Sequence, residues 1–184
     1  MATIWTVGHS NHDIDTFVRL IRGQSIEVVA DVRRFAGSRR HPHFGAEALA
    51  ASLTAAGIGY RHLAGLGGRR GKAAPVSPNT GWRVAAFNAY ADHMTTRAFR
   101  EDLAVLAALA VDRRVAIMCS EVLPWRCHRR LIADNLIVGG WSVLDIIGPG
   151  PPKAHVLTPF ARVADGALIY PADAIPSVPG PEPK

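Results

Sequence analysis

Apolar and polar positions along the chain follow two different periods, and the pattern predicts short strands separated by helices. Residues 3–8 are rich in β-branched and aromatic side chains, which is typical of a strand. Residues 13–22 place apolar side chains at helical spacing, and Asn11 or Asp13 can cap that helix. Residues 27–32 are nearly all apolar, as expected of a parallel strand buried on both faces.

The alternation continues to residue 147. Residues 47–56 predict a helix that stops at Gly57, and 58–63 predict a third strand. Residues 83–110 carry helical periodicity that Thr95 and Thr96 divide into two helices. The remaining elements are a strand at 114–119, a helix from Pro124 to about Val138, and a strand at 141–147. Residues 64–81 are rich in Gly, Pro and basic side chains and predict a long loop, a feature that often carries function.

The C-terminal part of the chain has a different pattern. Asp165-Gly166 lies between two apolar runs, which predicts a small hairpin within residues 158–170. Prolines then dominate, and they have no backbone donor for regular structure. We therefore predict one domain over residues 1–172 and a Pro-rich flexible tail over residues 173–184.

The order of elements predicts an α/β fold. We expect a single domain with a mostly parallel five-stranded sheet, helices on both faces and a small C-terminal hairpin. The 184 residues are 48% hydrophobic, which is enough for one sizeable core. The order of the strands in the sheet does not follow from this pattern.

Several cellular environments are disfavoured by the same sequence. No apolar run reaches the roughly 18–20 residues that span a bilayer. The N-terminus lacks the basic and apolar regions of a signal peptide. Two cysteines are too few for a disulfide framework. We expect a cytoplasmic protein that does not associate with a membrane.

Polar side chains follow the predicted strands at the point where each strand ends. The first strand runs into His9, the second into Asp31 and the fourth into Cys119. Sites in open parallel sheets form at the carboxyl ends of the strands, so we expect a site at this edge. The predicted substrate-binding residues are His9, Ser10, Asp31, Arg33, Ser38, Arg39, Arg83, Cys127 and Arg129.

The charge of the chain indicates what such a site binds. The formal net charge is +6, which favours anionic partners such as nucleic acids, nucleotides or phosphorylated metabolites. Converging arginines suit bidentate recognition of phosphate or carboxylate groups. The alternative interpretation is that these arginines form ion pairs with Asp31 and Glu121.

Three residues are the candidate catalytic groups. Cys119 is a candidate nucleophile, because the start of the next helix and Arg126 or Arg129 favour its thiolate. Glu121 lies two positions later on the same side of an extended chain and is a candidate acid or base. His128 is a candidate base. The alternative interpretations are a small core residue for Cys119 and a helix-capping or arginine-pairing carboxylate for Glu121.

A transition-metal site is a less favoured alternative for the same residues. Cys119, Cys127 and His128 offer sulfur and nitrogen ligands, and His9 is a further candidate ligand. Seven residues separate the two cysteines, which is not a usual zinc spacing. We therefore predict no cofactor and no metal ligands.

The motifs of the chain together resemble one known family. They are Thr6-Val-Gly-His-Ser10, Asp31-Val-Arg33, Gly37-Ser-Arg39, Leu66-Gly-Gly68, Gly81-Trp-Arg83 and Cys119-x-Glu121 with Cys127-His-Arg129. The resemblance is to the bacterial and archaeal family known as domain of unknown function 488, over roughly residues 3–171. It implies a fold and a set of motifs, but no reaction.

A looser similarity connects the chain to rhodanese-like domains. Those domains also have an Asp-Val-Arg strand and a cysteine that ends a later strand, which Cys119 would match. Here Glu121 follows in the loop, and its carboxylate would repel an anionic sulfur donor. Three hypotheses result: an enzyme acting on an anionic nucleotide, nucleic-acid base or phosphorylated metabolite; a non-catalytic nucleic-acid-binding module; or a rhodanese-like sulfur-transfer or thiol redox protein.

Overall fold

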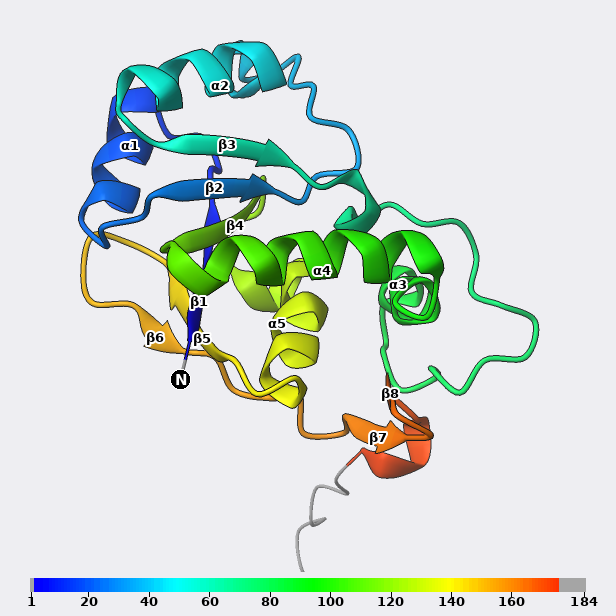
Figure 1. Ribbon diagram of the computed structural model, residues 1–184. Coiled ribbons are helices and arrows are strands. Elements are labelled where there is room, and N and C mark those ends of the chain that lie inside the picture. Colours follow the sequence, from blue (N-terminus) through cyan, green and yellow to red (C-terminus); the bar gives the residue numbers. More distant parts are fainter. Residues whose placement is uncertain (1, 176–184) are drawn as a thin grey trace, which may run out of the picture.

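The computed structural model describes residues 2–175 and places one sheet between two layers of helices (Figure 1). From one edge to the other the strands are β3 (Gly59–His62), β2 (Val28–Asp31), β4 (Val115–Cys119), β1 (Thr3–Gly8), β5 (Ser142–Ile146) and β6 (Lys153–Ala154). The first five run parallel, and β6 pairs antiparallel with β5. The predicted single-domain α/β class is confirmed. The two-residue strand β6 is an addition, because a segment that short has no detectable periodicity.

Helices cover both faces of the sheet. On one face lie α1 (Ile14–Arg22) and α2 (Ala46–Ala55), and on the other lie α3 (Ala85–His93), α4 (Arg97–Asp112) and α5 (Arg129–Val138). Neighbouring residues of a strand enter opposite cores because side chains alternate along it. Ile4 packs with the core under α4 and α5, whereas Trp5 packs with the core under α1 and α2.

Local sequence signals set the helix boundaries as predicted. The side chain of Asp13 caps α1 by accepting a hydrogen bond of 2.7 Å from the backbone N–H of Thr16. The hydroxyl of Thr96 caps α4, and this places the break between α3 and α4 at the predicted position. Just after α2, Gly57 has a φ of +73°, a left-handed conformation that suits glycine.

The segment after β4 differs from the prediction of one helix from Pro124 to Val138. A short 3-10 helix, η3 (Pro124–Arg126), comes first, and α5 begins only at Arg129. Cys127 between them is extended, with φ −131° and ψ 150°. Cys127 and His128 therefore precede α5, and the predicted start of this helix at Pro124 is wrong. The fixed φ of proline suits the start of either helix type, so the sequence does not distinguish them.

The predicted C-terminal hairpin is confirmed. Strands β7 (Arg162–Ala164) and β8 (Ala167–Ile169) pair antiparallel around Asp165 and Gly166, both with positive φ. Tyr170 follows, is fully buried and donates a hydrogen bond of 3.0 Å to a carboxylate oxygen of Asp134 in α5. The other short 3-10 helices are η1 (Pro42–Phe44), η2 (Ala64–Leu66) and η4 (Ala172–Ala174). Of the predicted tail over 173–184, residues 176–184 lie outside the described part.

The topology creates a crevice at one edge of the sheet. Strands β1 and β4 are neighbours, yet the chain leaves β1 toward α1 on one face and β4 toward α5 on the other (Figure 1). The connections diverge there, which is where ligands bind in open α/β sheets. Among residues 2–175, no helix combines the length and hydrophobicity needed to cross a bilayer.

Candidate active site

A cleft of about 820 Å³ opens at the carboxyl ends of β1, β2 and β4. This volume is typical of a small-molecule site. Its charged lining is strongly one-sided, since Glu121 faces five arginines across it. The arginines are Arg33, Arg34, Arg40, Arg69 and Arg126. The charged side chains of the cleft are therefore mostly positive.

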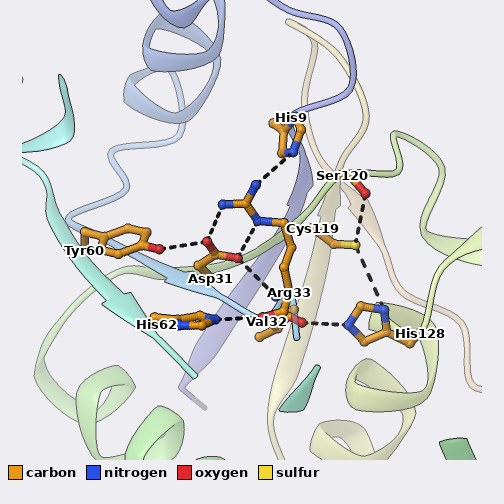
Figure 2. Close-up of polar contacts among 9 residues, drawn as sticks. All are labelled: His9, Asp31, Val32, Arg33, Tyr60, His62, Cys119, Ser120 and His128. Atoms are coloured by element: carbon orange, nitrogen blue, oxygen red, sulfur yellow. Dashed lines mark hydrogen bonds and ion pairs between the residues drawn. The ribbon is translucent and has the colours of Figure 1, made fainter. Parts of the chain in front are cut away.

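Arg33 is held in one orientation by a buried carboxylate. The guanidinium donates to both oxygens of Asp31, at 2.8 Å from Nε and 2.6 Å from Nη2 (Figure 2). The hydroxyl of Tyr60 donates to the same carboxylate at 2.8 Å. Asp31 is fully buried, so its role is to pair with and orient Arg33. The second terminal nitrogen of Arg33, Nη1, points toward His9.

His9 forms part of the cleft wall as a neutral imidazole. Its ring stacks on Phe44, with ring centroids 4.1 Å apart. Nδ1 donates to the carbonyl of Ser10 at 2.9 Å, and Nε2 faces Arg33 Nη1 at 3.4 Å. Burial lowers the pKa of His9 to about 4, so the ring is uncharged at neutral pH and Nε2 accepts from Arg33.

Two buried sulfurs and one imidazole meet at the floor of the cleft. Cys127 Sγ lies 3.5 Å and Cys119 Sγ 4.0 Å from Nδ1 of His128. The other ring nitrogen, Nε2, lies 2.9 Å from the carbonyl oxygen of Val32 (Figure 2). A carbonyl can only accept, so Nε2 donates to Val32 and Nδ1 is the ring nitrogen that faces both sulfurs.

The two thiols share one environment, but their acidities differ. The hydrogen bond with Cys127, reinforced by His128, holds the pKa of Cys119 well below its usual range. Burial raises the pKa of Cys127 well above its usual range. The pair therefore favours a single negative charge on Cys119 with the proton kept on Cys127.

The loop between β4 and α5 is held in place by Arg129 and packs closely against Gly8. Arg129 is fully buried and donates to the backbone carbonyls of Glu121 and Val122 and to the hydroxyl of Thr6. Gly8 packs directly under this loop, where an added Cβ would lie 1.8 Å from the carbonyl oxygen of Glu121. Arg129 is thus a positioning residue for the loop, and Gly8 is required for the close approach.

Most of the residues predicted from the sequence line the cleft. These are His9, Ser10, Arg33, Ser38, Cys119, Glu121, Cys127 and His128. Asp31 and Arg129 are buried beneath it. Arg39 and Arg83 are exposed and are not among the described residues that line the cleft.

Other cleft residues were not among the predicted substrate-binding positions. Arg34 and Arg40 are the sequence neighbours of Arg33 and Arg39, and both line the cleft. Arg69 comes from the Gly-rich loop, where its φ is +55°. The arginine pairs were visible in the sequence, but the residue pattern does not specify which member of a pair faces the cleft.

Comparison with known protein families places the chain in one of them. The model of a family described as domain of unknown function DUF488 matches residues 13–136, more than half of the chain. The chain belongs to the DUF488 family. No curated protein and no solved structure matches it significantly. The looser similarity to rhodanese-like domains stays a prediction.

The DUF488 match covers most of the cleft but not all of it. Arg33, Cys119, Glu121 and His128 lie inside residues 13–136. His9 follows β1, which lies outside the matched span although β1 is an inner strand of the sheet. The cleft of this DUF488 protein is therefore built from both matched and unmatched segments.

Proposed function

We propose that this DUF488 protein is an enzyme that acts on an anionic substrate, with a nucleotide as the best-fitting class. The observation that carries the proposal is the lining of the cleft. Five arginines and a single carboxylate surround a floor that holds a low-pKa thiol beside an oriented imidazole. A cationic cleft around a perturbed thiol is typical of catalytic sites.

Each part of the cleft has a role in this proposal. Arg33 is fixed by Asp31 and binds the anionic group without losing side-chain entropy. Cys119 and His128 supply the reacting centre at the floor. Glu121 is exposed in the wall and is the group that transfers a proton to or from the substrate.

Aromatic side chains in the cleft support a nucleotide over a phosphorylated sugar. The exposed ring of Phe35 lies at the cleft with 65% of its surface accessible, and Phe87 and Tyr90 also line it. Stacking of a base on such a ring contributes about 1–3 kcal/mol, a gain that a sugar phosphate lacks. The guanidinium of Arg34 lies 5.4 Å from the centre of the Phe35 ring, so charge and stacking surface are adjacent.

We also propose a reducing, cytoplasmic location for the enzyme. Cys119 and Cys127 are both free thiols, and such pairs persist in compartments kept reduced by thiol systems. A reduced pair is what the chemistry at the cleft floor requires. A disulfide between the two residues would remove both sulfurs from the reaction.

The test of anion binding compares two exposed arginines of equal charge. We expect Arg126→Ala to weaken nucleotide binding about tenfold, because it removes a charged hydrogen-bond donor from the cleft. Arg39→Ala removes the same charge outside the cleft lining and should leave the affinity unchanged. Isothermal titration of a panel of nucleoside mono-, di- and triphosphates measures both. Equal losses in the two variants, or no binding by any nucleotide, would contradict the proposal.

The Glu121→Gln variant tests the catalytic role of Glu121 separately from nucleotide binding. Glutamine keeps the size of the side chain but cannot accept a proton, so this variant should bind the nucleotide and lose its turnover. Once a turned-over nucleotide is identified, full turnover in Glu121→Gln would remove the role assigned to Glu121.

A further inference from the structure

One buried residue at the cleft floor takes no chemical step of its own in the proposed function. Cys127 is 3% exposed, yet its sulfur faces the same imidazole nitrogen as that of Cys119. The ligand atoms of Cys119, Cys127 and His128 all lie within 4.8 Å of one another. The proposed function uses only the sulfur of Cys119 as a reacting atom, so the second sulfur can have a further role.

The spacing of the three atoms is close to that of a tetrahedral metal site. Zinc bonds of about 2.3 Å to sulfur and about 2.0–2.1 Å to nitrogen require edges of roughly 3.6 Å between a sulfur and a nitrogen. The observed edges are 3.5 Å from Cys127 Sγ and 4.0 Å from Cys119 Sγ to His128 Nδ1. A shift of a few tenths of an ångström brings Cys119 Sγ to the required distance from Nδ1.

The surroundings of His128 favour coordination through Nδ1. Its Nε2 donates to the carbonyl of Val32, which fixes the ring and turns Nδ1 toward the two sulfurs (Figure 2). Ligating histidines are usually anchored in this way by a second hydrogen bond. Gly68 keeps the space beside Nδ1 open, because a Cβ there would lie 2.8 Å from that nitrogen.

The charge balance also favours a divalent cation. Two buried thiolates at this separation repel each other, and a divalent cation bound between them removes that repulsion. A divalent ion held by two thiolates and one neutral imidazole forms a neutral centre, and the thiol protons that it displaces go to solvent. Sulfur and imidazole ligands together select zinc over the hard cations Mg²⁺ and Ca²⁺.

We propose that Cys119, Cys127 and His128 bind a zinc ion whose fourth coordination position faces the cleft. All three residues line that cleft, and Glu121 lines it beside them. Three protein ligands and one open position distinguish catalytic from structural zinc sites. The binding site rests on the donor geometry alone. Its use in catalysis, with a substrate atom or water in the fourth position and Glu121 as proton acceptor, rests on the proposed function.

The test is a cobalt titration of the full chain after chelator treatment and reduction, without any substrate. Co²⁺ replaces zinc in tetrahedral sites and absorbs visibly. We expect one Co²⁺ per chain, with the intense visible bands of tetrahedral cobalt and a near-ultraviolet thiolate-to-cobalt band, both abolished by one equivalent of Zn²⁺. A wild-type chain that gives neither band overturns the proposal, whatever the variants do.

Variants identify the ligands. Cys119→Ser, Cys127→Ser and His128→Asn should each weaken Co²⁺ binding by more than about 100-fold, the upper end of losses seen even for second-shell changes. The matched control is His62→Gln, because the Nε2 of this exposed histidine also donates to a backbone carbonyl, that of Arg33. Circular dichroism checks that each variant folds. Unchanged binding in a folded Cys127→Ser variant overturns the site.

The proposed metal site and the proposed function can be rejected independently of each other. Arg126→Ala should keep full Co²⁺ binding while it weakens nucleotide binding. Cobalt bound through both sulfurs in a chain that binds no nucleotide would preserve the metal site and reject the proposed function. Nucleotide binding without cobalt binding would reject the metal site and preserve the proposed function.

Discussion

Asp31 has no solvent exposure, and its carboxylate is surrounded by hydrogen-bond donors from Arg33 and Tyr60. A buried carboxylate is costly unless it is paired, and the bidentate geometry with Arg33 offsets that cost. The same pair sets the orientation of one arginine in the cleft. Stability and the orientation of Arg33 therefore depend on a single charge at this position.

We expect Asp31→Asn to lower the free energy of unfolding by about 3 kcal/mol, because it leaves the Arg33 guanidinium buried without a counter-charge. Urea unfolding measures the change. The control is Glu101→Gln, which breaks the exposed ion pair with Arg97 and should cost about 0.5 kcal/mol or less. Equal changes in the free energy of unfolding would show that the buried pair stabilises the fold no more than the exposed pair does.

At the scale of secondary-structure elements, His155 joins α5 to β5. It follows β6, and its two ring nitrogens lie 3.2 Å from Asp134 in α5 and 2.9 Å from Asp145 in β5. Burial lowers its pKa, but the hydrogen bonds to the two carboxylates outweigh burial and raise the pKa from 6.5 to about 9. The histidine is therefore charged in the folded protein at neutral pH, between two elements that it holds together.

The stabilisation from charged His155 should depend on pH. The pKa is higher in the folded than in the unfolded chain, so the contribution is fully present below pH 6.5 and is lost as pH rises through about 9. We expect the stability difference between wild type and His155→Gln to shrink over this interval. Thermal unfolding from about pH 6 to about pH 10 measures it. A difference that stays constant with pH would contradict a charged bridge.

At the scale of the whole molecule, β1 is the strand on which the sheet depends. It lies between β4 and β5, and Ile4 and Val7 contribute fully buried side chains to the two cores. The segment that matches the DUF488 family begins after β1 and ends before β5. The matched span therefore lacks three strands of the sheet, β1, β5 and β6.

A fragment comprising residues 13–136 should not fold on its own. Removal of β1 exposes the inner edge of β4 and opens both hydrophobic cores, which only the complete sheet closes. Circular dichroism and the dispersion of amide proton resonances measure this, with the full chain as the reference. A fragment that unfolds cooperatively in urea would show that β1 and β5 are dispensable.

The sequence by itself determined the features that depend on neighbouring residues. Strands β1 to β5, most helix boundaries, the cap at Asp13, the break at Thr95-Thr96 and the hairpin turn at Asp165-Gly166 follow from short-range periodicity and backbone preferences. It also predicted that polar residues such as His9 and Cys119 lie at one edge of the sheet, because parallel strands share the direction in which they end.

Only the tertiary structure decided the features that depend on distant segments. The strand order places β4 between β2 and β1, and this brings Val32 against His128 across the chain. Packing also decided that Arg129 is buried, and that Arg40 rather than its neighbour Arg39 lines the cleft. Two cysteines at an unusual spacing share one imidazole because β4 and the start of α5 meet there. Such encounters are set by how the sheet and helices pack, and the local pattern contains no information about them.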